Sequence, residues 1–398
     1  MVTFAPKAIL AAGVATLALT GAAEAEDVKI GVLLGYTGPI ESLTPAMAAG
    51  AEMAMDEVSS SGALLGGTKL VPLRADSTCV DAAAATAAAE RLVTSDGVAA
   101  IMGADCSGVT TAVLQNVAVP NGVLMISPSA TSPALSAIED DGLFFRTAPS
   151  DARQGEIVAE ILRDQGVSSV AITYTNNDYG KGLATAIEAG VNALGGEVTL
   201  VAPHEDGKAD YAAEVGALAA AGGEVLVVAG YLDQGGRGII QGALDTGAFD
   251  TFYLPDGMVG DSLVEAFGSD LDGSFGAAPG ATGDGAAMFA ELFAAAGQEV
   301  GPYTGESYDA AAIMALAMQK AGSTDPAAVK AAVLEVANVP GERIMPGEIA
   351  KGLEIIANGG DVDYVGATNV ELIGAGESAG TYREIAIEGG AMVTVGYR

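Results

Sequence analysis

The chain has 398 residues, of which 50% are hydrophobic and 17% are charged, and its formal net charge is −34. This hydrophobic content supplies a large core, and a composition of this kind excludes a disordered chain. Because so acidic a surface repels phosphate backbones and anionic lipid, no nucleic-acid partner is expected. The length predicts two domains.

The N-terminus has the pattern of an export signal. Lys7 precedes an alanine-rich apolar run, and residues 23–25 (Ala-Glu-Ala) have the small-x-small form of a signal peptidase site. The run is broken by glycine and threonine and is shorter than the roughly 20 apolar residues of a spanning helix. We therefore expect a signal peptide over residues 1–25, a periplasmic location and no membrane span.

Cys79 and Cys106 are the only cysteines of the chain. In an exported protein such a pair predicts a disulfide, whereas a metal site needs more Cys or His ligands than this chain has. Closing this loop stabilises a fold by about 3 to 4 kcal/mol in the chain-entropy model. No metal ion or cofactor is expected.

Apolar strand-like runs alternate with helical runs, and the pattern starts twice. Short connections between continuous apolar strands indicate parallel α/β sheets in two lobes. The first series has strands at 28–34, 70–75, 99–103 and around 124, with helices at 46–58, 82–93 and 108–117. The second has strands at 170–174, 197–202, 225–229 and 251–254, with helices at 152–165, 179–194, 211–221 and 236–246.

The C-terminal part breaks this alternation. Residues 284–296, 307–321 and 326–336 are rich in Ala, Met and Leu and predict helices. Glycine-punctuated segments at 370–373, 382–387 and 392–395 predict antiparallel strands. A helical block followed by a strand block suggests that the chain crosses between the lobes more than once.

In open α/β sheets, ligands bind beyond the carboxyl ends of the strands. In the first series, the loops at 105–107 and 127–131 are rich in hydroxyls, and Ser107 stands where a helix N-cap is expected. In the second, the loops supply Tyr179, Tyr231, Asp233 and Asp256. An aromatic wall with one acid opposite an anion pocket suits a zwitterion such as an amino acid.

Several motifs together resemble one known family. They are LLGYTGPI after the first strand, Cys79 with Cys106-Ser107, ISPSATSP, FRTAPSD, NNDYGKG and LPDG. In this order and spacing they are similar to the periplasmic leucine/isoleucine/valine-binding proteins of ABC importers, over essentially the whole mature chain. The resemblance implies the type I periplasmic-binding-protein fold, with two Rossmann-like lobes joined by a three-segment hinge. It also implies a monomer that delivers a small amino-acid-like ligand to an ABC permease in the inner membrane.

The resemblance implies a division of the chain as well. Residues 26–148 and 280–365 would form lobe 1, and residues 149–279 and 366–398 would form lobe 2. The crossings would fall near residues 148–150, 279–280 and 364–366.

Three residues in the first-lobe loops match positions that bind the ligand carboxylate. Ser107 and Thr131 correspond to hydroxyl ligands, and the backbone of Ser129 corresponds to a further contact. Ser129 replaces an alanine of the branched-chain binders. The resemblance therefore implies a carboxylate site with one additional hydroxyl.

The second-lobe residues match an ammonium site. Asp256 corresponds to an acid that binds the α-ammonium group, and it is shorter than the glutamate of the branched-chain binders. Tyr179 and Tyr231 match tyrosines that close over the ligand. In the first loop, Glu41 stands where an aromatic residue often lines the side-chain pocket; either it is solvated, or it faces a ligand with a second polar or cationic group. The ligand therefore remains open between a hydrophobic amino acid and an amide, urea, an aromatic acid or a polar amino acid.

An enzyme and a receptor are the alternatives. Residues 376–380 fit the G-x-S-x-G pattern of a nucleophile, which would make Ser378 the nucleophile of a serine hydrolase. That pattern requires a histidine downstream, whereas the only histidine, His204, lies upstream and is expected in a solvated loop. The sensor domain of a membrane receptor could share the fold, but no following segment is expected to anchor it. We therefore expect a binding protein and not an enzyme.

Overall fold

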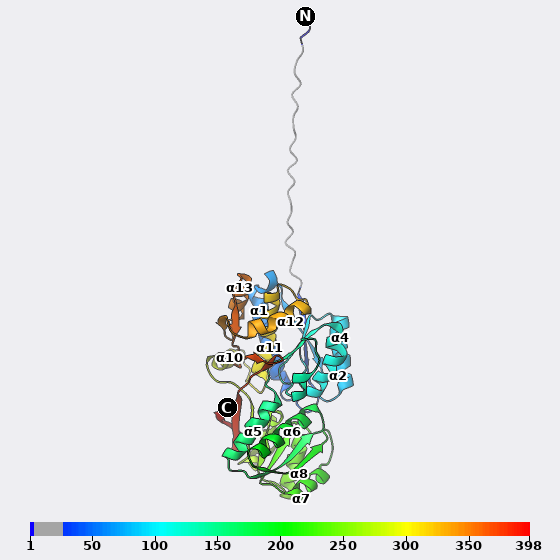
Figure 1. Cartoon of the computed structure of the whole chain (residues 1–398), viewed down its shortest axis with the longest axis vertical. Coiled ribbons are helices and arrows are strands. Elements are labelled where there is room, and N and C mark those ends of the chain that lie inside the picture. The colour runs from blue at the N-terminus through cyan, green and yellow to red at the C-terminus, as the bar shows by residue number, and fades with distance from the viewer. Residues whose placement is uncertain (4–26) are drawn as a thin grey trace.

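The computed structural model describes residues 1–3 and 27–398, so the predicted signal peptide lies outside the described residues apart from its first three. The described chain forms two α/β lobes, one above the other in Figure 1. Each lobe is built on its own seven-stranded sheet. The predicted fold class is therefore confirmed.

Lobe 1 contains the first sheet. From one edge to the other its strands are β13 (Leu372–Ile373), β14 (Glu377–Ser378), β5 (Phe144–Arg146), β4 (Leu124–Ser127), β3 (Ala100–Gly103), β1 (Val28–Leu34) and β2 (Leu70–Asp76). Only β13 runs antiparallel to its neighbour. The helices of this lobe are α1 (Thr44–Ser61), α2 (Ala82–Glu90), α3 (Ser107–Val113), α4 (Val119–Asn121), α10 (Asp284–Ala295), α11 (Thr304–Ala321), α12 (Pro326–Ala337) and α13 (Ile349–Ala357). A separate parallel pair joins β11 (Glu342–Ile344) to β12 (Val362–Tyr364).

Lobe 2 contains the second sheet. Its strands are, in spatial order, β16 (Ala391–Tyr397), β15 (Tyr382–Glu388), β10 (Phe275–Pro279), β9 (Phe252–Leu254), β8 (Val225–Ala229), β6 (Ser169–Thr175) and β7 (Glu197–His204). The last two strands of the chain, β15 and β16, add antiparallel to the edge at β10, as the sequence predicted. The helices are α5 (Asp151–Asp164), α6 (Asp178–Ala193), α7 (Ala212–Ala221), α8 (Gly235–Thr246) and α9 (Asp261–Phe267).

Burial explains the strand pattern. Every residue of β3, β4 and β8 is buried, which is expected where helices cover both faces of a parallel sheet. Helix α11 is equally enclosed, because each of its residues from Thr304 to Met318 is buried. Its alanines and methionines therefore fill the core of lobe 1 against α1, α12 and α13.

The third crossing between the lobes lies later than the sequence suggested. It falls between β14 and β15, at residues 379–381, and not at 364–366. The reason is strand pairing: Glu377 of β14 pairs with Arg146 of β5, and their side chains form an ion pair of 2.5 Å. Residues 366–378 therefore stay with the first sheet, and the C-terminal share of lobe 2 begins after Ser378.

Among the helices of residues 1–3 and 27–398, none combines the length and the apolar character that crossing a membrane requires.

Candidate functional site between the lobes

The loops at the carboxyl ends of the strands meet in a small cavity between the lobes. Lobe 1 supplies Ile40, Leu43, Asp105, Cys106, Ser107, Ser129 and Tyr303 to its lining, and lobe 2 supplies Tyr179, Tyr231, Asp256 and Gly257. The volume open to the centre of a water-sized sphere is about 20 Å³. A single water needs about 10 to 15 Å³ on this measure, so the cavity between the closed lobes has room for about one water, and any larger ligand requires its walls to move apart.

Asp256 is the acid of this cavity. It follows β9 and is only 2% exposed. One carboxylate oxygen accepts a hydrogen bond of 2.7 Å from Tyr179 Oη, and the other accepts one from Tyr303 Oη. The next residue must be glycine, because a Cβ at Gly257 would lie 2.6 Å from Tyr179 Oη. Asp256 is therefore held by phenols from both lobes.

Tyr179 and Tyr231 form the aromatic wall on the lobe 2 side. Their rings are stacked with centroids 5.1 Å apart. Asn177 caps the N-terminus of α6 with its side-chain oxygen, which fixes the turn that presents Tyr179. The Asn177 side-chain amide also donates to Tyr231 Oη at 3.4 Å. Both predicted tyrosines therefore line the cavity.

Ser107 and Ser129 lie on the opposite wall. Ser107 is the first residue of α3 and Cys106 is its N-cap, one residue before the predicted cap. Ser107 Oγ accepts a hydrogen bond of 3.0 Å from the Ser132 N–H, which leaves the hydroxyl proton free for a further acceptor. Ser129 Oγ donates to the Asp105 carbonyl at 3.0 Å.

Thr131 lies behind this wall and does not line the cavity. It is 1% exposed, and its hydroxyl has no hydrogen-bond partner among the described residues. The Thr131 carbonyl accepts from the Asp151 N–H at 2.8 Å. Thr131 is thus placed to support the wall, next to the first crossing between the lobes.

Asp105 and the disulfide hold the base of the first-lobe loops. The Asp105 carboxylate accepts from the Gly35 N–H at 2.5 Å, from Ser77 Oγ at 2.8 Å and from the Cys106 N–H at 3.0 Å. Burial raises the pKa of Asp105 above its usual value. The predicted Cys79–Cys106 disulfide is present, so three loops are tied together beneath Ser107.

A second buried acid lies close to Asp256. Asp151, the first residue of α5, accepts from the Gln154 side chain at 3.0 Å, and Gln154 in turn accepts from the Asp256 N–H at 3.3 Å. Burial, and then the charge of Asp256, raise the pKa of Asp151 well above its usual value. These effects favour a neutral Asp151 beside Asp256.

Glu41 does not face the cavity. Its side chain is exposed and accepts from the Gly38 N–H at 3.3 Å. The same loop instead contributes Ile40 and Leu43 to the lining. At the rim, Asp233 of lobe 2 accepts from the Ser42 N–H at 3.0 Å, which joins the two lobes directly.

The sequence reasoning missed Tyr303 and Asp151. The rule for open α/β sheets points to loops that follow strands, whereas Tyr303 immediately precedes α11 and Asp151 begins α5. The available signal for Tyr303 was the Gly-Pro pair before it, which marks a turn at a helix start.

The structure does not provide the context of a serine hydrolase. Ser378 lies in β14, a strand of two residues in the first sheet, without the strand-turn-helix that a nucleophile elbow needs. His204 ends β7 in the second sheet. The expectation of a solvated His204 is wrong: it is 1% exposed, its Nδ1 lies 2.8 Å from Thr173 Oγ1, and burial lowers its pKa to about 4. No cluster of three or more His, Cys, Asp or Glu suited to a metal ion occurs among residues 1–3 and 27–398.

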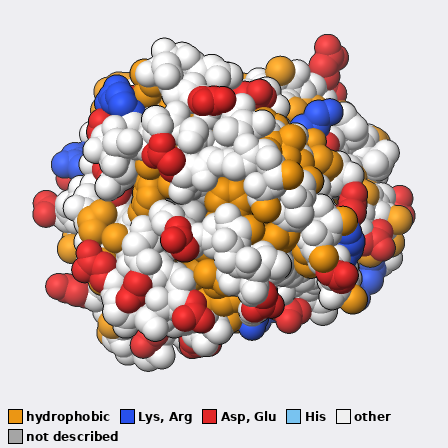
Figure 2. Space-filling view, turned by 90° about the horizontal axis from the view of Figure 1, so that it is seen from below, with side chains coloured by type: hydrophobic (Ala, Val, Ile, Leu, Met, Phe, Trp, Pro, Cys, Tyr) orange, Lys and Arg blue, Asp and Glu red, His pale blue; other side chains and the backbone are white. Residues whose placement is uncertain are grey.

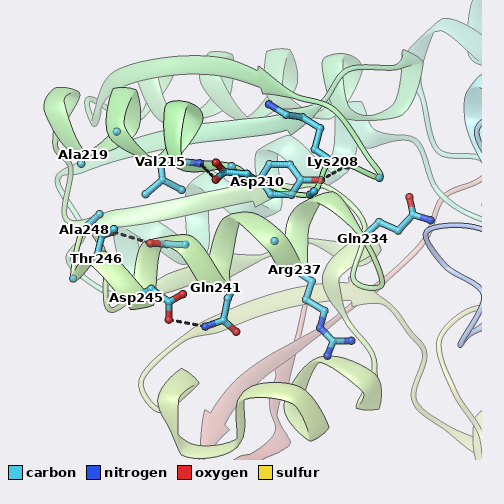
Figure 3. A pocket seen from close by; sticks show the side chains of 18 of the residues that line it. Lys208, Asp210, Val215, Ala219, Gln234, Arg237, Gln241, Asp245, Thr246 and Ala248 are labelled. Atoms are coloured by element: carbon cyan, nitrogen blue, oxygen red, sulfur yellow. Dashed lines mark hydrogen bonds between the residues drawn. The ribbon is translucent and has the colours of Figure 1, made fainter.

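A wider groove lies on lobe 2 alone, between α7 and α8 (Figure 3). By the same measure its volume is about 1140 Å³. Lys208, Gln241 and Asp245 stand along it, and two of these are engaged with each other, since Gln241 donates to Asp245 at 2.8 Å. The surface at the lower end of Figure 1, shown in Figure 2, carries many more Asp and Glu than Lys and Arg side chains. Because one lobe forms the whole groove, closure of the lobes cannot enclose a ligand there.

Known proteins share these features. A sequence profile of the periplasmic binding protein family matches residues 27–354. The Leu/Ile/Val-binding protein homolog 1 of Brucella melitensis is 32% identical over 81% of this chain and 85% of its own length. An amino acid binding protein of Pseudomonas aeruginosa is 31% identical over 81% of this chain and 86% of its own length. These relatives are named as binding proteins and not as enzymes.

Solved structures show the same fold. A leucine binding protein from Thermotoga maritima superposes with a TM-score of 0.78 at 21% identity, covering 93% of this chain and 98% of that one. A solute binding protein from R. palustris, solved with benzoate, gives 0.74 at 18% identity and covers 93% of this chain and 96% of that one.

Two lobes that close on a buried polar cavity define a bilobal solute-binding protein. The chain belongs to the periplasmic binding protein family. This membership agrees with the periplasmic location expected from the sequence.

Proposed function

We propose that this protein captures a small amino-acid-like ligand between its lobes and delivers it to an ABC-type import permease. The observation that carries the proposal is Asp256, a buried acid enclosed by residues of both lobes. Its ligand would be a zwitterion with the ammonium group on Asp256. An ammonium group suits this position because a buried carboxylate favours a charged donor.

The ligand carboxylate would bind on the opposite wall. Ser107 presents a free hydroxyl proton there, and the N-terminus of α3 offers backbone N–H groups, whereas the Ser129 hydroxyl would have to leave the Asp105 carbonyl to donate to the ligand. Thr131 would not touch the ligand. It would position this wall, and its carbonyl would hold Asp151 in place. Glu41 is left out of the proposed site because it is exposed and hydrogen-bonded within its own loop.

The side chain of the ligand would contact Ile40, Leu43 and the ring of Tyr231. This partly apolar surface, together with relatives named for leucine, isoleucine and valine, supports a branched-chain or other hydrophobic amino acid. The solved neighbour with benzoate supports an aromatic acid as the second candidate, since the Ser107 hydroxyl and the N-terminus of α3 would serve any carboxylate.

The mechanism would be hinge closure. Ligand contacts with both lobes shift an open–closed equilibrium, and the closed form presents a matched surface to the permease. No step of this mechanism requires catalysis by the protein.

A thermal-shift screen of the purified mature chain tests the ligand class. Hydrophobic amino acids, their amides, urea, polyamines and aromatic acids are compared at equal concentration. A ligand at a hundred times its dissociation constant stabilises the folded form by about 2.7 kcal/mol. A shift by a zwitterionic amino acid is expected. Shifts only by compounds that lack an ammonium group would contradict the role of Asp256.

A further inference from the structure

A second cavity lies at the hinge and shares Tyr303 with the ligand cavity. Its volume, on the measure used above, is about 340 Å³. Both lobes form it: Pro279 and Gly280 of the second crossing, the beginning of α11, and Arg383 and Tyr397 of the C-terminal strands. Nothing proposed above for the ligand cavity uses this space.

Glu306 is a buried acid of the hinge cavity. It is 5% exposed and lines the cavity, and its carboxylate accepts from its own backbone N–H but from no other residue in the described ranges. Asp309, one turn later on α11, shows the contrast: it accepts from Tyr364 Oη, from the Ala367 N–H and twice from Thr368. Burial raises the pKa of Glu306 to about 7. A carboxylate has room for several donors, so burial with one donor is costly and an occupant that donates to Glu306 is favoured.

Arg383 supplies the opposite charge in the same cavity. It lies on β15, and its guanidinium forms no ion pair with any acid in the described ranges 1–3 and 27–398. Its one hydrogen bond is a long contact of 3.5 Å to Thr394 Oγ1. Glu306 and Arg383 therefore line one cavity without forming a direct ion pair.

The rest of the lining is mixed. Phe289, Pro302 and Tyr303 are apolar or aromatic, Thr368 is polar, and Val300 and Tyr397 are exposed at the edge of the cavity. Aromatic faces attract an ammonium group, and apolar walls accept a short methylene chain.

We propose that the hinge cavity is a second binding site, which takes a small zwitterion with its ammonium group on Glu306 and its carboxylate on Arg383. An ammonium group offers three donors to the Glu306 carboxylate, and a guanidinium binds a carboxylate through two parallel hydrogen bonds. A simple cation would leave Arg383 unpaired and repelled, which favours a zwitterion. This site is separate from the ligand cavity and does not depend on the function proposed for it.

Calorimetric titration with glycine, β-alanine and 4-aminobutanoate tests the site, because these probes differ only in the spacing of their charges. The wild-type mature chain, Glu306→Gln and Asp256→Asn are compared. At least one probe is expected to bind the wild type and Asp256→Asn equally, and to lose roughly tenfold or more affinity in Glu306→Gln. Binding that survives Glu306→Gln but is lost in Asp256→Asn would place the probe in the ligand cavity and overturn the second site. Absence of binding by all three probes would overturn it as well.

Two further variants complete the test. One examines the proposed contact between Arg383 and the ligand carboxylate, and the other controls for the loss of a negative charge. Arg383→Gln is expected to weaken the zwitterion that binds but not the corresponding amine without a carboxylate. Equal effects on both compounds would contradict the role of Arg383. Glu299→Gln, an exposed acid in the loop before α11, is the charge control and is expected to bind like the wild type.

Discussion

Tyr303 of lobe 1 donates a hydrogen bond to Asp256 of lobe 2. Both side chains are buried, and the bond joins the lobes at the ligand cavity itself. The acid assigned to the ligand is therefore also a contact between the lobes. Ligand binding and closure are coupled at one carboxylate.

Tyr303→Phe is expected to favour the open form of the ligand-free protein. The substitution keeps the ring but leaves one Asp256 oxygen without its donor, which costs about 1 to 3 kcal/mol in the closed form. Small-angle scattering should report a larger radius of gyration without ligand. Tyr308→Phe is the matched control, because Tyr308 Oη donates at 2.6 Å to Glu57 within lobe 1. Equal radii for the wild type and Tyr303→Phe would mean that this bond does not hold the lobes together.

Asp233→Ala is expected to speed ligand release. Asp233 accepts from the Ser42 N–H at 3.0 Å across the rim and from Ser262 Oγ at 2.7 Å. Loss of the bond across the rim, at about 1 kcal/mol, should raise the dissociation rate roughly fivefold with little change in association. Asp245→Ala, which removes a contact with Gln241 inside lobe 2, should leave the rate unchanged. A slower association with an unchanged dissociation rate would mean that the hydrogen bond between Asp233 and Ser42 does not hold the closed lobes together.

Removal of the disulfide is expected to weaken both the fold and the site. The Cys79–Cys106 bond closes a loop with a sequence separation of 27, which predicts a loss of about 3 to 4 kcal/mol. Cys106 also lines the cavity beside Ser107. The double variant Cys79→Ser/Cys106→Ser should therefore melt earlier and bind more weakly, as measured by thermal unfolding and calorimetry. Full affinity in a destabilised variant would show that the disulfide serves the fold alone.

Glu306→Gln is expected to raise stability near neutral pH. Burial, and to a smaller extent the charge of Asp309, raise the pKa of Glu306 from 4.5 to about 7, while the hydrogen bond from its own backbone N–H and the charge of Arg383 oppose the shift. Between these values the folded chain binds more protons than the unfolded chain, so this group lowers stability as the pH rises, by about 3 kcal/mol in all. The free energy of unfolding of Glu306→Gln should equal that of the wild type near pH 4.5 and exceed it above pH 7. Denaturant unfolding at these two pH values measures the difference, with Glu299→Gln as the control. A variant less stable than the wild type above pH 7 would mean that the Glu306 carboxylate has a further donor in solution.

Most of the order of strands and helices was predictable because those elements have their own patterns, whereas β5, β10 and α13 were not predicted. Fully apolar strands such as β3 and β8 and the glycine-separated C-terminal strands are local signals. The third crossing was not predictable in this way. It depends on the pairing of Glu377 with Arg146, two residues that are distant in the chain.

Only some residues of the candidate site were predictable from the sequence. Tyr179, Tyr231 and Asp256 follow strand ends, so the rule for open α/β sheets and the family resemblance both point to them. Tyr303 reaches Asp256 from the other lobe, and Asp151 reaches it through Gln154. The first contact arises only when the lobes close, and the second joins α5 to the loop after β9 within lobe 2. No local pattern contains either of them.

Calorimetry with one amino acid and two matched derivatives tests the zwitterion site most directly. The amino acid that gives the largest thermal shift is compared with its amide, which lacks the carboxylate, and with its deaminated acid, which lacks the ammonium group. The proposed site predicts that both derivatives bind the wild type roughly tenfold or more weakly, since each leaves a buried partner unpaired. It also predicts that Asp256→Ala loses the amino acid and not the deaminated acid. A deaminated acid that binds the wild type as tightly as the amino acid would contradict the assignment of Asp256 to the ligand.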